Sequence, residues 1–151
     1  QQRVFRSLPG LGEAVFARYG SVHRNTYLNA PRQLTEKLEL RARPGVFVAG
    51  QMAGVEGYVE SAALGGLAGR FAASAVRGES APMPPASTAH AALLRHLGEA
   101  DPDHFQPMNV NWGLFPALAQ SPRKRLERNQ ALAARALADL APWLVQTEPA
   151  S

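Results

Sequence analysis

The feature that most constrains the fold is a short apolar run that leads through glycines into a long stretch of small residues. Residues 46–49, Val-Phe-Val-Ala, lack polar alternation, which is typical of a strand covered on both faces. Gly50, Gly54 and Gly57 follow, and glycine permits a positive φ or a close backbone approach. A helix is predicted over residues 58–76. A strand that enters a helix through glycines forms an anion-binding arrangement, so this stretch predicts a ligand site.

The predicted helix contains three glycines, which need a physical reason. Gly65, Gly66 and Gly69 each cost about 1 kcal/mol relative to alanine in a helix. Small residues offset that cost when they let a helix lie close to a sheet. We therefore interpret these glycines as packing residues, and we expect the helix to stop at Gly78.

Two other segments have the pattern of strands. Residues 14–19 are rich in β-branched and aromatic side chains, and a glycine follows them. Residues 34–42 alternate apolar leucines with charged side chains, which is typical of a half-buried strand near a sheet edge. Both segments are expected to be strands.

Two further helices are predicted toward the C-terminus. The first is expected to be capped by Ser87 or Thr88 and to end near Gly98, with its leucines on one side. The second is expected to begin at Ser121 and Pro122, a serine cap with proline in the first turn. Its predicted apolar stripe comprises Leu126, Ala133, Leu137, Leu140 and Leu144.

Composition excludes several classes of protein. A chain of 151 residues that is 46% hydrophobic is long enough for one packed domain. No apolar run approaches the roughly 20 residues that span a bilayer, which argues against a membrane protein. The absence of cysteine removes disulfides and thiolate metal sites, in agreement with a cytoplasmic protein, and no metal site is predicted. The net charge of +4 permits a polyanionic partner such as RNA.

Three polar segments are candidate binding surfaces, and each has a plain structural alternative. Residues 23–29 contain groups that can bind a planar heterocycle, and from composition alone a solvated loop is the favoured interpretation. Residues 105–116 combine amides with aromatic rings between prolines, and they could cover a site or fill a gap in the core. Basic residues crowd residues 123–128 at the start of the last helix, where the helix dipole disfavours them. Phosphate binding would explain them, but a solvated basic end is the commoner reason.

Three motifs in the same order resemble one known family. They are residues 19–31 (Tyr-Gly-Ser-Val-His-Arg-Asn-Thr-Tyr-Leu-Asn-Ala-Pro), residues 50–63 (Gly-Gln-Met-Ala-Gly-Val-Glu-Gly-Tyr-Val-Glu-Ser-Ala-Ala) and residues 105–113 (Phe-Gln-Pro-Met-Asn-Val-Asn-Trp-Gly). They resemble the TrmFO family, the folate- and FAD-dependent tRNA (uracil-5-)-methyltransferases related to the GidA group. With the basic C-terminal helix, the resemblance covers nearly the whole chain.

The resemblance implies an α/β fold, the C-terminal part of a Rossmann-like FAD-binding domain of the glutathione-reductase type with appended C-terminal helices. Residues 1–42 would end an inserted domain and return into the FAD domain. Residues 43–78 would form the FAD-binding strand, turn and helix, and residues 79–151 a helical extension. The family's Gly-x-Gly-x-x-Gly fingerprint and a nucleophilic cysteine are absent from this sequence, which also opens without methionine. The chain is therefore expected to be a C-terminal fragment that contains no catalytic residue and is inactive alone.

The implied activity transfers a one-carbon unit from methylenetetrahydrofolate, through reduced FAD, to carbon 5 of a T-loop uridine in tRNA, with NADH or NADPH as reductant. The implied partners are tRNA and the N-terminal remainder of the same protein. Two alternatives are a basic, non-enzymatic RNA-binding module and another FAD-dependent oxidoreductase of the GidA group.

The resemblance also implies roles for individual residues. The implied FAD-binding residues are Gly50, Gln51, Met52, Gly54, Val55, Glu56, Gly57 and Tyr58. The implied folate or substrate pocket comprises His23, Arg24, Asn25, Tyr27, Asn109 and Asn111. The implied contacts to tRNA phosphates are Arg123, Lys124, Arg125 and Arg128. Gln51 stands where wider flavoprotein relatives often have an acidic residue, so no carboxylate–ribose contact is expected.

Overall fold

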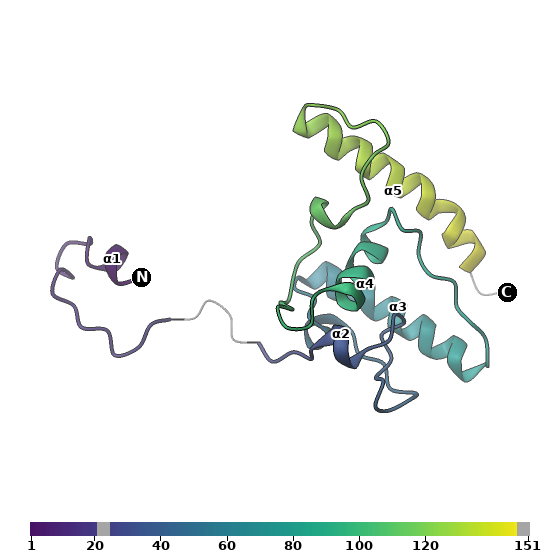
Figure 1. The fold of residues 1–151 in the computed structure, drawn as a ribbon, viewed down its shortest axis with the longest axis horizontal. Helices are drawn as coiled ribbons and strands as arrows, with labels where there is room; N and C mark the ends of the chain where they lie inside the picture. Colours follow the sequence, from purple (N-terminus) through teal and green to yellow (C-terminus); the bar gives the residue numbers. More distant parts are fainter. Residues whose placement is uncertain (21–24, 148–151) are drawn as a thin grey trace.

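The computed structural model describes residues 1–20 and 25–147, and its regular structure is helical. Figure 1 labels the α-helices, from α1 near the N-terminus to α5 near the C-terminus. In chain order the elements are α1 (Gln2–Phe5), α2 (Ala30–Gln33), the 3₁₀ helix η1 (Gly50–Ala53), α3 (Tyr58–Val76), α4 (Ala89–Glu99), the 3₁₀ helix η2 (Trp112–Leu114) and α5 (Arg125–Thr147).

One hydrophobic core joins α2, α3 and α4 with the segments that connect them. Leucines at helical spacing on α3 and α4 belong to this core, and Phe105 and Trp143 from later segments complete it. The buried core residues are Ala30, Leu34, Leu38, Ala53, Val55, Leu64, Leu67, Ala68, Phe71, Leu93, Leu94, Leu97, Phe105 and Trp143.

Helix α3 has the predicted bounds. It begins after Gly57, whose φ is +94°, and it ends before Gly78, whose φ is +69°. The Gly78 N–H donates to the Ala75 carbonyl (3.1 Å) and the Glu79 N–H donates to the Ser74 carbonyl (2.9 Å). This pair of bonds is a Schellman motif, which requires the left-handed residue that glycine supplies.

Helix α4 also has the predicted cap. Thr88 Oγ1 accepts a hydrogen bond from the Ala91 N–H (3.3 Å) and donates one to the Pro85 carbonyl (2.7 Å). Thr88 is buried, so both bonds replace water at the start of the helix.

The predicted strands are not formed as strands. Across residues 1–20 and 25–147 the backbone makes only isolated β-bridges, Leu34 with Leu40, Glu39 with Phe47, and Val55 with Met108. Leu38 takes a φ of +64°, which folds residues 34–42 back on themselves instead of extending them. Residues 46–49 run beside that turn, since the Val48 N–H donates to the Leu38 carbonyl (2.9 Å). The alternating pattern of residues 34–42 therefore reflects a tight turn with buried leucines.

Residues 14–19 were also predicted to form a strand, and this is wrong for the described structure. Residues 1–20 bond among themselves: the Gln1 side chain bonds the backbone of Gly20, and Arg6 donates to the Ala14 carbonyl (3.1 Å). Phe16 packs between Phe5 and Tyr19 at centroid distances of 5.9 and 5.6 Å. No ladder partner is present for residues 14–19 among the described residues, so the segment stays irregular. In Figure 1 these residues lie to one side of the helices from α2 onward.

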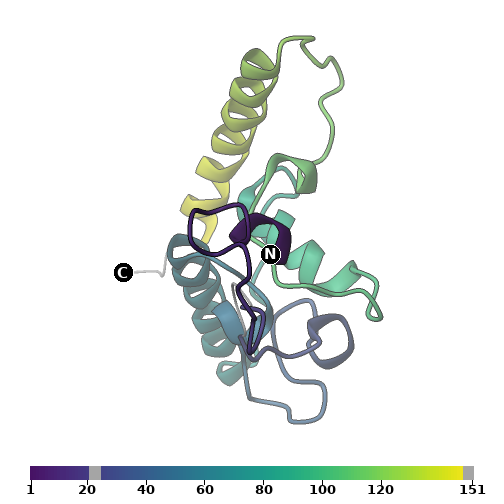
Figure 2. The same ribbon diagram turned by 90° about the vertical axis from the view of Figure 1, so that its left-hand side faces the viewer.

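Helix α5 differs from its prediction in both start and packing face. It begins at Arg125, after Ser121 and Pro122, and its buried side chains are Leu132 and Trp143. Most of the predicted stripe is exposed: Leu126 is 70% exposed and Leu137 is 68% exposed. The buried face of α5 is offset from the predicted stripe by about one residue. On the buried face, the Arg70 guanidinium of α3 lies 5.1 Å from the centroid of the Trp143 ring. Figures 1 and 2 both show the end of α5 beside α3 and its start farther away.

Within the described residues, no helix has both the length and the apolar character needed to cross a membrane.

Candidate functional site

Two glycines shape the turn before α3, where neighbouring side chains crowd the position of a Cβ atom. Gly54 has a φ of +94°, and a Cβ there would lie 2.5 Å from Cζ of the buried Phe105 ring. Gly50 has a φ of +65°, and its Cβ would lie 3.3 Å from Cβ of Ser61. The glycine pattern was therefore a correct signal of close approach, and the approaching groups are Phe105 and the first turn of α3.

A second segment joins this turn through a parallel β-bridge. The Glu56 N–H donates to the Met108 carbonyl (3.0 Å), and the Met108 N–H donates to the Gly54 carbonyl (3.1 Å). The bridge brings Asn109 to Gly57, where a Cβ would lie 2.9 Å from Asn109 Nδ2. Residues 105–116 thus do both things that the sequence allowed, since Phe105 fills the core and Asn109 reaches the site.

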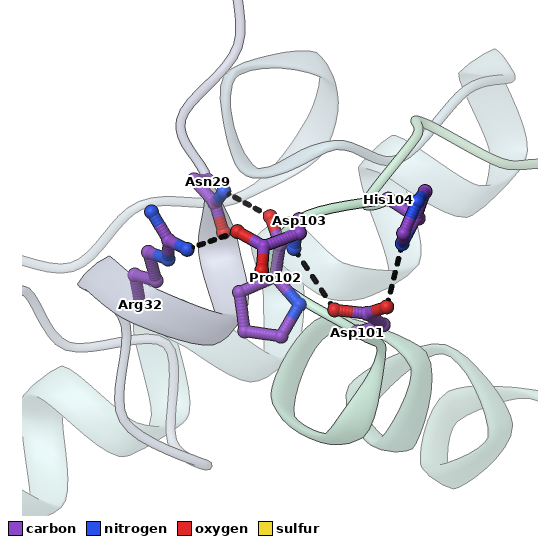
Figure 3. Close-up of polar contacts among 6 residues, drawn as sticks. All are labelled: Asn29, Arg32, Asp101, Pro102, Asp103 and His104. Carbon is purple, nitrogen blue, oxygen red and sulfur yellow. Dashed lines mark hydrogen bonds and ion pairs between the residues drawn. The ribbon is translucent and has the colours of Figure 1, made fainter.

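A third segment, residues 25–33, is tied to both. The Leu28 N–H donates to the Met52 carbonyl (2.8 Å). Figure 3 shows the polar contacts between α2 and the loop after α4: Asn29 Nδ2 donates to the Pro102 carbonyl (2.7 Å), and Arg32 forms an ion pair with Asp103. These contacts tie residues 28–32 to the glycine turn and to the loop after α4.

Asp101 organises the loop that carries these contacts. Its Oδ2 lies 2.6 Å from Nδ1 of His104, and its Oδ1 accepts from the Asp103 N–H (3.0 Å) (Figure 3). The bond with His104, then the Asp103 N–H and the charge of Arg32, lower the pKa of the Asp101 carboxyl below its ordinary value. Asp101 is therefore a carboxylate that accepts two bonds and keeps the loop in its turn.

The three segments line a pocket of about 370 Å³ that is open to solvent. It is lined by Asn25, Gln51, Val55, Glu56, Gly57, Tyr58, Ser61 and Asn109. All of these except Ser61 were predicted as site residues. Ser61 could have been found from its place one turn after Gly57, because first-turn side chains lie over a helix N-terminus.

The polar groups of the pocket are mostly neutral. Its lining includes the amide residues Asn25, Gln51 and Asn109 and the hydroxyl residue Ser61, and none of the described lining residues is cationic. Glu56 is on the wall, and Glu60 lies close to Gly57, so two carboxylates flank the start of α3. No side chain caps the α3 N-terminus within the described structure. Its free N–H groups can therefore donate to a ligand, while the carboxylates disfavour one as strongly charged as a phosphate.

Other predicted residues lie elsewhere or serve the scaffold. Gly50 and Gly54 shape the turn from behind, and Met52 contributes its carbonyl to Leu28. Tyr27 packs edge-on against Phe105 with centroids 6.0 Å apart. The Asn111 side chain accepts from the Gly113 N–H (3.0 Å) and so caps η2. His23 and Arg24 lie outside the described residues.

The basic residues that precede and begin α5 form a separate surface. Arg123, Lys124, Arg125 and Arg128 are all exposed, and Lys124 pairs with Glu127 at 3.2 Å. None of them lines the pocket at the glycine turn. In the part of the chain that the structure describes, no cluster of three or more His, Asp or Glu side chains is placed to hold a metal ion.

Comparison with known proteins identifies relatives along the whole chain. The protein named methylenetetrahydrofolate–tRNA-(uracil-5-)-methyltransferase TrmFO of Syntrophotalea carbinolica is 59% identical over 143 residues, which cover 95% of this chain and 31% of that protein. The proteins of the same name from Desulforudis audaxviator and Pelobacter propionicus are 55% and 53% identical, over 97% and 100% of this chain and 34% and 33% of their own lengths. The chain thus spans about a third of the length of these curated relatives.

The resemblance predicted from the three motifs is confirmed by these matches. A family model described as glucose inhibited division protein A also matches residues 1–80, more than half of the chain. The chain belongs to the glucose inhibited division protein A family.

Proposed function

We propose that the chain is the C-terminal part of a flavoprotein that methylates carbon 5 of a tRNA uridine, with methylenetetrahydrofolate as donor. The observation that carries the proposal is the pocket at the glycine turn, which three separate segments line with seven of the residues expected to bind FAD or folate. The relatives named for this activity match the chain from end to end. Because the chain spans about a third of their length, the activity belongs to a longer polypeptide of which this chain is one part.

The proposed cofactor fits the pocket in part. A volume of about 370 Å³ suits a flavin ring with a second ring stacked on it, not a whole dinucleotide. The neutral lining and the two nearby carboxylates make the pocket more suitable for the flavin ring of FAD than for its pyrophosphate. The pyrophosphate would be held by the remainder of the longer polypeptide. Bound FAD would supply the redox step and carry the one-carbon unit. Gln51 and Ser61 would hydrogen-bond its polar edge, and the α3 N-terminus would stabilise negative charge on its reduced ring.

The folate would lie on the other side of the pocket. Asn25 and Asn109 present amide groups from opposite segments, and amides can pair with the donors and acceptors of a pterin ring. His23 and Arg24 precede Asn25 in the sequence, and they remain proposed members of this side together with Tyr27 and Asn111. NADH or NADPH would reduce the flavin, and the cytoplasm, where tRNA is modified, is the proposed compartment.

A Rossmann-like α/β domain is the proposed fold of the complete protein, with residues 43–78 as its FAD-binding part. The support comes from α3, whose open face carries Gly65, Gly66 and Gly69, with no described atom within 4 Å of a Cβ at any of them. Val59 is 80% exposed and Val76 is 90% exposed on the same helix. A helix that bears three costly glycines toward open space is suited to close packing against a sheet from the remainder of the polypeptide.

The test is flavin binding by the full-length protein that contains this chain. Purified wild type should be yellow, with the visible spectrum of a flavin. Gly57→Ala should lose most of the flavin, because its Cβ would meet Asn109 and Glu60 and its φ of +94° is unfavourable for alanine. Gly78→Ala is the matched control, since Gly78 also has a positive φ (+69°) but open space around it. A colourless wild type, or equal flavin content in both variants, would contradict the proposal.

A basic, non-enzymatic RNA-binding module is the second candidate, supported by the exposed cluster Arg123, Lys124, Arg125 and Arg128. It predicts RNA binding by a flavin-free protein, with affinity that falls steeply as salt rises. A flat salt response would remove the basic cluster from either function.

A further inference from the structure

A second cavity lies where η2 approaches the first turns of α5. Its volume is about 290 Å³, and its walls include Trp112, Phe115, Leu132 and Arg128. It shares no lining residue with the pocket at the glycine turn. Neither the FAD nor the folate assignment uses it.

The cavity presents an aromatic platform. The Trp112 and Phe115 rings lie 4.9 Å apart at 46°, and Trp112 is 40% exposed, so solvent reaches the indole ring. An exposed indole beside a second ring has a flat face on which a planar ligand can stack.

Arginines on two helices hold this platform in place. Arg95 of α4 donates to the Leu114 carbonyl. Arg135 of α5 donates to the Pro116 carbonyl (2.5 Å) and the Ala117 carbonyl (2.9 Å). Charge-assisted bonds of this kind are stronger than neutral ones, so the loop that carries both rings is fixed before any ligand arrives.

Positive charge borders the same cavity. Residues 121–128 supply Ser121 and Arg128 to its wall, and the intervening Arg123, Lys124 and Arg125 are exposed. Glu127 is the one acidic residue of this segment and pairs with Lys124. A stacking surface beside several cations is the combination that single-stranded nucleic acid requires, because bases stack on the rings while phosphates meet the charges.

We propose that this cavity binds an unpaired base of RNA, stacked on Trp112, with the neighbouring phosphates on Arg125 and Arg128. The proposal extends the proposed function, since tRNA would be the RNA that uses the site. Stacking is sequence-tolerant, so the site would hold an extruded or loop nucleotide and would not select its identity.

The test measures RNA affinity of the full-length protein by fluorescence anisotropy with three labelled probes. They are an unmodified tRNA transcript, a single-stranded RNA of about 10 nucleotides and a duplex of the same length. Trp112→Leu keeps apolar bulk without the flat ring and should weaken binding of the tRNA and the single strand by about 5- to 150-fold, the loss of one stacked base. Trp112→Phe should restore most of the affinity. Tyr19→Leu, an exposed ring outside the cavity, should change nothing.

Salt dependence separates stacking from charge. Trp112→Leu should leave the slope of log affinity against log salt unchanged, whereas Arg125→Ala should reduce that slope by about 1. Unchanged far-ultraviolet circular dichroism in each variant would exclude misfolding. The proposal is overturned if Trp112→Leu binds the single strand like wild type, weakens the duplex equally, or is not rescued by Trp112→Phe. The flavin spectrum of the same preparations tests the proposed function independently. A colourless protein whose Trp112 variants show the expected affinity changes would support the base-binding site and contradict the flavin-dependent function.

Discussion

Replacement of Gly54 by alanine should destabilise the chain far more than an ordinary glycine substitution. The backbone at Gly54 is left-handed, with a φ of +94°, and a residue with a Cβ atom loses about 1–2 kcal/mol there. The added Cβ would also lie 2.5 Å from Cζ and 2.8 Å from Cε1 of Phe105. The Phe105 ring is 5% exposed and lies against Tyr27 and His96, so it cannot move aside freely. Overpacking of this kind costs about 1–3 kcal/mol, which gives a total of about 2–5 kcal/mol.

Gly45→Ala separates the two contributions. Gly45 has a φ of +84°, but no described atom lies within 4 Å of its Cβ position, so only the backbone cost of about 1–2 kcal/mol applies. Urea unfolding followed by far-ultraviolet circular dichroism gives the free energy of unfolding of both variants.

A double-mutant cycle with Phe105→Leu then measures the clash itself. If the ring is the obstacle, Gly54→Ala should cost at least about 1 kcal/mol less in the Phe105→Leu background than in wild type. Additive effects, or equal losses in Gly54→Ala and Gly45→Ala, would refute the steric reasoning.

Three other outcomes follow from residues described above. Leu38→Ala should lower the free energy of unfolding by about 2–4 kcal/mol, because the lost burial exceeds any gain at its φ of +64°; no loss in urea unfolding would contradict this. Gly66→Ala should stabilise the 151-residue chain by about 1 kcal/mol of helix propensity and so raise its melting temperature, and it should lower the melting temperature of the full-length protein if a sheet covers α3; a change of the same sign in both would refute the covered face. Asp101 has a lowered pKa in the folded state, so its contribution to stability is present above its ordinary pKa and is lost as pH falls through the folded value. Asp101→Asn should therefore be less stable than wild type near neutral pH and match it in acid, as urea unfolding at several pH values would measure.

Helices α3 and α4 and their caps were predictable because their signals are local. The bounds of α3 follow from Gly57 and Gly78, and the start of α4 follows from the Thr88 side chain. Each involves groups within a few residues of one another, so the sequence carries the whole interaction.

The strands and the face of α5 were not predictable for the opposite reason. Alternation in residues 34–42 suggests leucines on one covered face of a strand, but a turn through Leu38 also buries Leu34 and Leu38 and half-buries Leu40. On α5, two apolar stripes fit a helical period, and the structure buries Trp143 of the second stripe in the core beside Arg70 of α3. Such choices depend on partners distant in the chain.

The candidate site lies between these cases. Gly54 and Gly57 marked the turn, and the motifs of residues 19–31 and 105–113 suggested its other walls. The bridge between Val55 and Met108, which aligns those walls, has no local signature. The family resemblance implied that Tyr27 and Asn111 belong to the folate pocket, and each has a packing or capping partner within the protein.

The bridge between Val55 and Met108 also bears on the order of folding. Helices α3 and α4 lie between these two residues in the chain, so the bridge closes a long loop. The chain must lose the conformational entropy of that loop before the pocket is formed. We expect both helices to form first and the binding pocket to be completed late. A ligand in the pocket would then slow hydrogen exchange at the Glu56 and Met108 amides, which donate the bridge bonds, more than in the middle of α3.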